Sequence, residues 1–171
     1  MAGQLFQVAT TTITSATASM SITGIDTDDV YVLAFSNIRS SVDSATGLYL
    51  RFTESGSPNT NANYDYADKD LRCSEAFGID YAVDQTVLSL AWATGNATGE
   101  EDGGILTIFN ANNSSAYTMM QYESYYMVST PKLRGRQGGL VLTENTEVDG
   151  IHLYWSHGDI TSGTFTLYRQ V

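Results

Sequence analysis

A period of two in the side chains, clearest in residues 160–168, is the feature that most constrains how this chain can fold. In that segment Ile160, Phe165 and Leu167 occupy apolar positions and threonines occupy polar ones. Alternation of this kind is typical of a β-strand with one buried and one solvated face. We expect the Ser162-Gly163 pair to turn one short strand into the next. The same alternation recurs along nearly the whole chain, so the sequence predicts an all-β protein.

The length and the supply of apolar residues favour a single domain over residues 1–171. Hydrophobic residues make up 42% of the chain and aromatic residues 11%, which is enough for a substantial core. Turn signals divide the chain into about eight to ten strands, at a spacing typical of sandwiches and jelly rolls. We therefore predict a single-domain antiparallel β-sandwich that is jelly-roll-like.

The expected strands are separated by polar loops, and one segment has helical character. Residues 67–77 are expected to form one or two helical turns with Asp68 as the cap. Residues 132–139 are expected to form a loop. In the strand over residues 117–128, the odd-numbered side chains share a face. The expected strands cover residues 15–22, 30–38, 48–53, 83–92, 105–109, 117–128, 140–143, 151–155 and 164–168.

The charge balance excludes two classes of partner. The chain has 19 acidic residues against 8 lysines and arginines, a net charge of −11. This field repels phosphate backbones and acidic lipids, so we expect neither direct nucleic-acid binding nor membrane binding. No apolar run approaches the ~20 residues that span a bilayer, and the first residues have no signal-peptide pattern. The single cysteine, Cys73, excludes an intramolecular disulfide, so we expect folding in a reducing cytosol.

The polar composition suits surfaces that assemble. Charged residues make up only 16% of the chain, and serine, threonine, asparagine and glycine supply the remaining polarity. Hydroxyl and amide groups lose less free energy than charged groups when a partner covers them. The segment with Lys132, Arg134 and Arg136 holds three of the eight basic residues. It is a candidate contact for an acidic partner, with a solvated loop as the alternative.

Two histidines lie near the end of the strand predicted over residues 151–155. A hydrolase would need a nucleophile, a base and an orienting acid together. His152 and His157 are accompanied by no Gly-x-Ser-x-Gly motif and do not form the His-x-His pattern of many sandwich metalloenzymes. We interpret them as structural, and we expect no catalytic residue and no cofactor.

Carboxylates cluster in several predicted loops. The spacing of Asp65, Asp68 and Asp70 makes them the first candidates for a Ca²⁺ site, because calcium prefers oxygen ligands. None of the clusters, Glu100–Asp102 included, matches the twelve-residue EF-hand loop. We favour solvated acidic turns and predict no metal site.

The aromatic residues leave two alternatives open. Glu123 lies among tyrosines in the strand over residues 117–128, but a glycosidase needs a second carboxylate ~5–9.5 Å away. The sequence places no such acid, so a glycosidase is a remote alternative. Eleven tyrosines and two tryptophans could stack on sugars, so a carbohydrate-binding role stays open.

The carboxyl-terminal residues resemble the ending of small virion structural proteins of tailed bacteriophages. Those proteins end on the pattern Gly-x-Ile-x-Ser-Gly-Thr-Phe-x-Leu-Tyr-Gly, and this chain has Arg169 in place of the last glycine. The opening is similar too, with an alternating Ser/Thr/Ala strand, then residues 31–38, then the Arg51-Phe52 pair. The similar C-terminal residues are Glu147-Val-Asp-Gly-Ile-His-Leu-Tyr-Trp155 and Gly158-Asp-Ile-Thr-Ser-Gly-Thr-Phe-Thr-Leu-Tyr168.

The resemblance implies a jelly-roll component of the phage virion, commonly a homotrimer, with no enzymatic residues to transfer. The partners it implies are further copies of the chain and the major capsid protein or other virion proteins. We favour a capsid decoration, or cement, protein on the head shell, because the chain lacks the stalk repeats or heptads of a fibre. The alternative is a tail or neck fibre, or a receptor-binding module that meets a host surface glycan. Either way, we expect the chain to fold in the host cytoplasm and to be exposed on the released virion.

Overall fold

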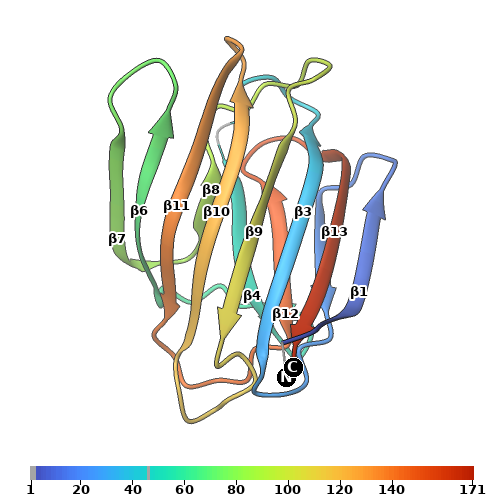
Figure 1. Cartoon of the computed structure of the whole chain (residues 1–171), viewed down its shortest axis with the longest axis vertical. Coiled ribbons are helices and arrows are strands. Elements are labelled where there is room, and N and C mark those ends of the chain that lie inside the picture. The colour runs from blue at the N-terminus through green and yellow to red at the C-terminus, as the bar shows by residue number, and fades with distance from the viewer. Residues whose placement is uncertain (1–2, 46) are drawn as a thin grey trace.

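Two antiparallel β-sheets lie face to face in the computed structural model, which describes residues 3–45 and 47–171 (Figure 1). The all-β sandwich prediction is confirmed, because these residues form thirteen strands and no helix. Within them, no helix is long and apolar enough to cross a membrane. The predicted domain over residues 1–171 also includes residues 1, 2 and 46, which lie outside the described residues.

The strands form one sheet of eight and one of five. The larger sheet has the order β1-β13-β3-β9-β10-β11-β6-β7, and the smaller has the order β2-β12-β4-β5, with β8 also pairing with β4. The strands are β1 (Leu5–Ile13), β2 (Ser19–Thr23), β3 (Val30–Ser40), β4 (Leu48–Glu54), β5 (Ser57–Pro58), β6 (Tyr64–Arg72), β7 (Gly78–Gln85), β8 (Leu88–Ala91), β9 (Asp102–Phe109), β10 (Thr118–Val128), β11 (Lys132–Leu142), β12 (Gly150–Trp155) and β13 (Ile160–Gln170).

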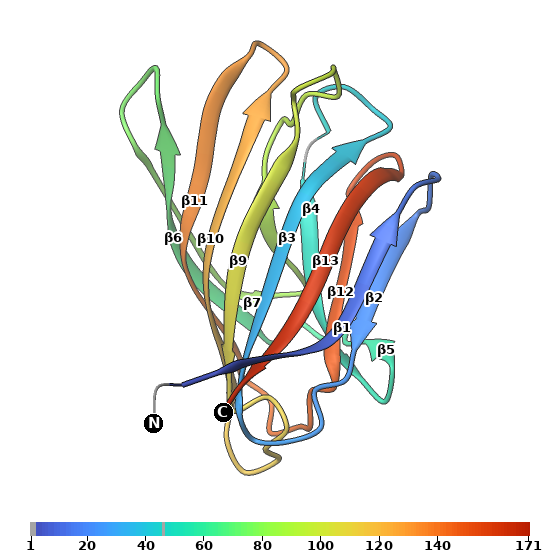
Figure 2. The ribbon, with the colours of Figure 1, turned by 45° about the vertical axis from the view of Figure 1, so that its right-hand side comes forward.

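Eight of the strands pair in the order of a jelly roll. These eight are β1, β2, β3, β4, β8, β9, β12 and β13. The first of them along the chain pairs with the last, the second with the last but one, and so on: β1 with β13, β2 with β12, β3 with β9, and β4 with β8. Two hairpins, β6–β7 and β10–β11, are inserted into this core and widen the larger sheet (Figure 2). Of the thirteen strands, β1, β5 and β6 lie outside the predicted ranges, and the one strand predicted over residues 83–92 corresponds to two, β7 and β8.

One hydrophobic core fills the space between the sheets, because each strand turns alternate side chains inward. Leu48, Leu50 and Phe52 of β4 are fully buried, which confirms the predicted face of residues 48–53. The predicted face of β10 is also confirmed, because its odd-numbered side chains point away from the core. Burying a side chain of this kind stabilises the fold by ~1.5–3 kcal/mol.

The helical turns predicted over residues 67–77 are absent. β6 continues to Arg72 and β7 begins at Gly78. β6 has hydrogen-bonded neighbours on both sides, β11 and β7, and this pairing overrides the local preference of the sequence. Asp68 is therefore no helix cap but a buried residue of a strand.

The loop predicted over residues 132–139 is also wrong, because β11 runs through it. A Cβ on Gly138 would lie 2.3 Å from the Cβ of Asp68, and one on Gly135 would lie 2.6 Å from the carbonyl oxygen of Ser124. These glycines, which favoured a loop in the sequence, instead allow β6 and β10 to approach β11 closely.

Three further differences concern turns and strand limits. The Ser162-Gly163 pair lies inside the continuous strand β13, where the register to β3 shifts, and makes a bulge instead of a turn. The strand predicted over residues 83–92 is two strands, β7 and β8, in different sheets. The edge strand β1 was not predicted.

Substitution of two adjacent glycines tests the close approach of β6 and β11. Gly138→Ala should lower the free energy of unfolding by ~1–3 kcal/mol, because the new methyl group overlaps Asp68. Gly139→Ala is the matched control, since its Cβ would meet nothing nearer than the Met120 carbonyl oxygen at 3.6 Å. Denaturant unfolding of both variants measures the difference. Equal losses would contradict the packing argument.

Candidate functional site

A buried ionic cluster lies on the inner face of the inserted hairpins. The side chains of Arg136 (β11) and Asp68 (β6) are only 2% and 0% exposed. The guanidinium donates from Nη2 to Asp68 Oδ2 over 2.7 Å and from Nε to Oδ1 over 3.2 Å. Asp80 (β7) also accepts from Nη2, and the Tyr122 hydroxyl (β10) donates to Asp68 Oδ2 over 2.5 Å. These four residues, the ionic cluster, join all four strands of the two hairpins.

The ionic cluster also satisfies one edge of the smaller sheet. β8 lies at that edge, so the carbonyl groups on its outer side need hydrogen-bond partners. Arg136 Nη1 donates to the Ser89 carbonyl oxygen over 2.8 Å, and the Ser124 hydroxyl donates to that of Leu90 over 2.5 Å. Side chains of the larger sheet thus take the place of a further strand.

The pKa values in the cluster reflect its burial. Burial raises the pKa of Asp68 above its ordinary value, although the hydrogen bond from Tyr122 and the charge of Arg136 act in the opposite direction. Burial likewise raises the pKa of Tyr122, and its bond to Asp68 adds to the rise. The Asp68 carboxylate therefore depends on Arg136 for compensation of its charge.

A cleft of about 350 Å³, which we name the Trp92 cleft, opens beside the ionic cluster. The inner faces of β6, β7 and β11 contribute charged residues, and the segment that follows β8 contributes Trp92. Trp92 is 43% exposed. The lining includes Asp70, Arg72, Asp80, Trp92, Arg134 and Arg136.

Each guanidinium of the Trp92 cleft already holds a carboxylate. Arg72 binds Asp70 over 2.7 Å and Glu75 over 3.2 Å, and Arg134 binds Glu75 over 2.7 Å. Arg136 is held within the ionic cluster. The cleft therefore offers hydrogen-bonding groups without an uncompensated positive charge.

Two buried polar atoms beside the cleft have no hydrogen-bond partner: Asp70 Oδ1 and the hydroxyl of Tyr126. Tyr126 is fully buried. Burial raises its pKa to about 12, and Asp70 adds to the rise while Arg136 and Arg134 oppose it. A buried polar group without a partner costs about 1–3 kcal/mol.

Buried hydrogen bonds hold the turn that follows Trp92. Ala93 has a φ of 54°, in the left-handed region that a residue with a Cβ rarely adopts. The fully buried Thr94 exchanges two backbone hydrogen bonds of 3.1 Å with Ala45. Its hydroxyl donates to Asp102 Oδ2 over 3.1 Å. Asp102 is 2% exposed, and burial raises the pKa of its carboxyl well above the ordinary value.

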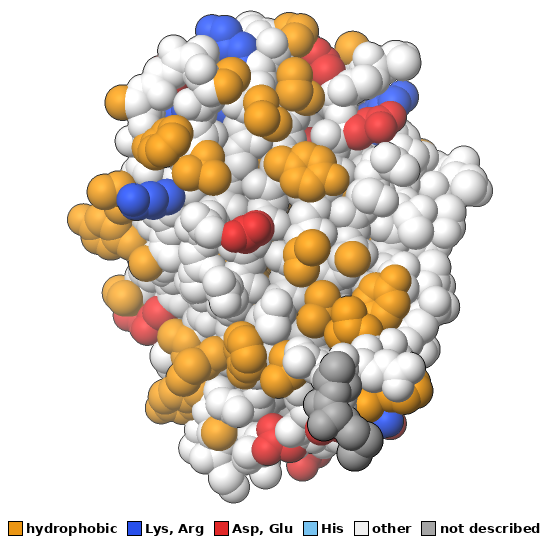
Figure 3. All heavy atoms as spheres, viewed as in Figure 1, with side chains coloured by type: hydrophobic (Ala, Val, Ile, Leu, Met, Phe, Trp, Pro, Cys, Tyr) orange, Lys and Arg blue, Asp and Glu red, His pale blue; other side chains and the backbone are white. Residues whose placement is uncertain are grey.

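The outward face of the larger sheet presents a second surface, which we name the outer face: the outward side chains of β6, β7, β9, β10 and β11. Figure 3 shows hydrophobic side chains scattered over this face with few charges between them. Ile79 and Tyr81 of β7 are each 75% exposed. Further exposed hydrophobic residues of the outer face are Val83, Ile105, Met119, Tyr125 and Leu133. Such a face is typical of a surface that meets a partner.

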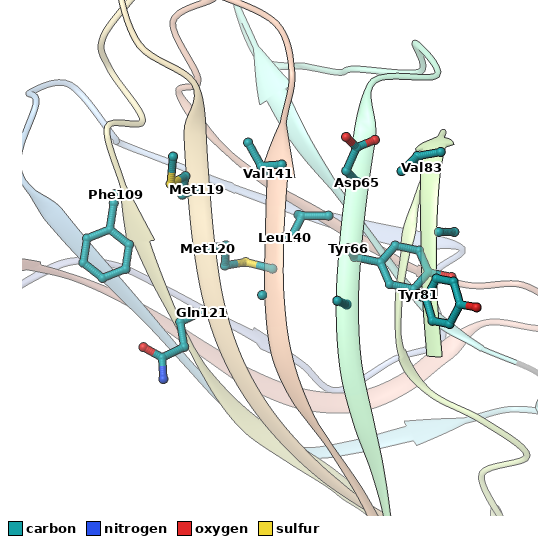
Figure 4. Close-up of a pocket in the computed structure, with 13 residues that line it drawn as sticks. Asp65, Tyr66, Tyr81, Val83, Phe109, Met119, Met120, Gln121, Leu140 and Val141 are labelled. Carbon is teal, nitrogen blue, oxygen red and sulfur yellow. The ribbon is translucent and has the colours of Figure 1, made fainter. Parts of the chain in front are cut away.

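A shallow groove of about 560 Å³ crosses one end of the outer face (Figure 4). Figure 4 shows Tyr81 of β7 on one side and Met119 and Phe109 on the other. Between them, Gly139 of β11 is paired with Ala67 of β6. These two small residues keep the floor of the groove low.

The three basic residues predicted to contact a partner all lie in β11. Arg136 is buried in the ionic cluster and is not available to a partner, so that part of the prediction is wrong. Arg134 is 25% exposed and binds Glu75, and Lys132 is exposed at the start of the strand. A partner contact through Lys132 and Arg134 stays a prediction.

The structure does not bring the three calcium candidates together. Asp68 is bound by Arg136, Asp70 is bound by Arg72, and Asp65 lies on the opposite face of β6. Among the described residues, no group of three or more histidine, cysteine or acidic side chains lies close enough to hold a metal ion.

The acidic segment Glu100–Asp102 is not a solvated turn. Glu100 is buried, and its carboxylate accepts from the backbone amide of Ala97 over 3.0 Å. Glu101 binds Arg39. With Asp102 also buried, this cluster anchors the loop before β9.

The two histidines do not share a site. His152 Nδ1 and the hydroxyl of Ser21 are 2.8 Å apart, while His157 lies beyond the end of β12. Burial lowers the pKa of His152, and the nearby Arg51 lowers it further. The residue paired with His152 in β4 is the cationic Arg51, whereas the histidine of a catalytic triad needs a carboxylate beside it.

Glu123, the glycosidase candidate, lies on the outer face. Its neighbours in register are Ile105 and Gln137, and Gln137 donates a hydrogen bond to it over 2.6 Å. The residues that line the shallow depression around it include no second carboxylate.

Comparisons with known proteins identify no family. No family model matches the chain, and no curated protein matches it. Among solved structures, one similar chain comes from the structure of infectious bursal disease virus, Gx strain, with 9% sequence identity and a TM-score of 0.17. The alignment covers 99% of this chain and 40% of the viral one. A score this low carries no argument about fold or function.

Loss of Arg136 should strongly destabilise the protein. Arg136→Met should lower the free energy of unfolding by ~3–5 kcal/mol, because it leaves a buried carboxylate without compensation. Arg134→Met removes a partly exposed ion pair and should cost less than ~1 kcal/mol. Denaturant unfolding measures both, and adding Asp68→Leu to Arg136→Met should recover part of the loss. Similar losses in the two single variants would refute a central role for the cluster.

Asp102→Asn should raise the free energy of unfolding near neutral pH. Because the folded-state pKa of Asp102 is raised, its contribution to stability is complete below the unfolded pKa and is lost as the pH rises through the folded pKa. The gap between the free energies of unfolding of the wild type and the variant should therefore widen as the pH rises above about 4, the ordinary pKa of an aspartate. Denaturant unfolding over a series of pH values measures this gap. Asp84→Asn, at an exposed position, is the control. Parallel curves for wild type and Asp102→Asn would be incompatible with this assignment.

Proposed function

We propose that this protein is a non-enzymatic structural component of a tailed-phage virion, a decoration or cement protein on the head shell. The observation that carries the proposal is the outer face, a broad sheet surface with exposed apolar side chains and few charges. The resemblance of the carboxyl-terminal residues to phage virion proteins is the reason for proposing a phage particle as the assembly.

The physics of the outer face favours contact with neighbouring subunits. Exposed apolar area contributes ~25 cal/mol per Å² when a partner removes it from water. The charged side chains there are sparse. Lys69 and Glu123 carry opposite charges and lie on one row across the strands, with Gln137 between them. Little charge must therefore be desolvated, even though the whole chain carries a net charge of −11.

The edge of the larger sheet gives a second reason for assembly. β7 ends the sheet on one side, and its outward side chains are Ile79, Tyr81 and Val83, none of them a lysine that would discourage pairing. A homotrimer in which neighbouring copies cover these edges would protect them. Such a trimer is part of the proposal.

Charge placed in the groove of the outer face should abolish assembly without unfolding the chain. We expect Tyr81→Lys with Met119→Lys to lower occupancy on the particle at least about tenfold, since burying two added lysines at the contact costs more than ~1.4 kcal/mol. Both side chains are largely exposed, so the thermal unfolding of the free chain should not change. Rebinding to particles that lack the protein measures the effect. Thr60→Lys with Thr98→Lys, at exposed loop positions, controls for charge.

The location of the chain in the intact particle separates the proposal from its rival. Electron cryo-microscopy should find many copies as trimers over the shell, and the shell should resist heat better when they are present. A few copies at the neck or tail, with free protein that blocks adsorption to host cells, would favour the receptor-binding alternative. Full occupancy by the Tyr81→Lys, Met119→Lys variant would reject the outer face as the contact.

A further inference from the structure

We propose that the groove of the outer face holds the amino-terminal arm of a second copy of this chain. The amino-terminal arm is the first part of β1, residues Leu5–Val8. The inference rests on the proposed function, because it takes the homotrimer proposed there and names the contact that joins its subunits.

The amino-terminal arm is apolar and open to solvent. Leu5 is 52% exposed, Phe6 46% and Val8 37%, and Gln7 is exposed as well. Successive side chains of a strand point to opposite faces, so both faces of the arm are open. The register of β1 with β13 shifts between Gln7 and Ala9, and a bulge of this kind bends an edge strand. The arm is therefore a distinct segment with apolar side chains to bury.

The groove offers matching chemistry. Figure 4 shows Tyr81 on one side of it and Met119 on the other, and these side chains are 75% and 49% exposed. Among the described residues that line the groove, only Asp65 is charged. An aromatic side chain such as that of Phe6 can therefore fill the groove with little desolvation of charge.

The charge of the chain indicates a second copy as the occupant. Two copies that each carry −11 repel one another, so they can meet closely only where both surfaces are nearly free of charge. The first 25 residues contain no charged side chain, and the groove is nearly uncharged. A cationic partner would instead gain from the acidic surface elsewhere on the chain.

The positions of the arm and the groove require two different copies. The arm pairs with β13 at one edge of the larger sheet, and the groove lies towards the other edge, β7 (Figure 1). The strand order places β11, under the middle of the groove, five spacings of ~4.8 Å from β1, roughly 24 Å. Because the arm and the groove are different surfaces, their contact is heterologous, and heterologous contacts can close into rings. Three copies in such a ring give the trimer of the proposed function.

Charge exchange between the arm and the groove tests the proposal. Sedimentation velocity of the free chain should show a trimer. We expect Phe6→Asp, and separately Tyr81→Lys, to raise the concentration at which half of it dissociates at least about tenfold, since each variant buries an unpaired charge. In Phe6→Asp with Tyr81→Lys the two new charges attract each other between copies, so the trimer should recover. Ile105→Lys, on the outer face but outside the groove, is the matched control and should leave the trimer intact.

Thermal unfolding of each variant shows whether it folds, and Phe6→Ser, which removes the ring without adding a charge, replaces Phe6→Asp if that variant does not. A wild-type chain that is monomeric at about 100 µM, an unchanged trimer in the Phe6 variant, or no recovery in the double variant would overturn the inference. Binding to particles is measured separately. A trimer that fails to bind particles would reject the proposed function and leave the arm contact standing, and a monomer that binds them would do the opposite.

Discussion

The bond between Arg136 and Asp68 is the interaction on which the arrangement of this protein depends. It lies where the two inserted hairpins meet the smaller sheet, and it joins β6 and β11 while Asp80 and Tyr122 bring in β7 and β10. Arg136 also donates to Ser89 at the edge of β8. A buried ion pair contributes little net stability. Its consequence is geometric, because each of these groups would be buried without a partner in any other register.

The inserted hairpins give the jelly roll two surfaces that its eight core strands alone would not have. Outward, they widen the larger sheet into the apolar outer face. Inward, they extend past the smaller sheet, so the charged inner side of β6, β7 and β11 faces the turn that carries Trp92. Both surfaces depend on the same strand pairing. The outer face and the Trp92 cleft lie on opposite sides of the larger sheet.

The surroundings of each acidic residue in this chain depend on the side of the sheet it occupies and not on the sequence next to it. Acidic residues that the sequence predicts in solvated turns occupy three different environments. Asp68 is an interior ion-pair partner, Asp102 is a buried carboxyl with a raised pKa, and Asp65 lies on the outward side of a strand. The same chemical group thus supports packing, anchors a turn or stays in solvent, according to the side of the sheet it occupies.

The sequence by itself determined the all-β class, the faces of β4 and β10 and the sandwich architecture, because a period of two is a local property of a strand. It did not reveal the continuation of β6 and β11, since the glycines around Gly138 indicate a loop until the neighbouring strands are known. The meeting of Arg136 with Asp68, 68 residues apart, and of Trp92 with Asp70 and Tyr126 was decided only by the tertiary structure. Such contacts arise from the pairing of distant strands, and alternation within one strand carries no information about its neighbour.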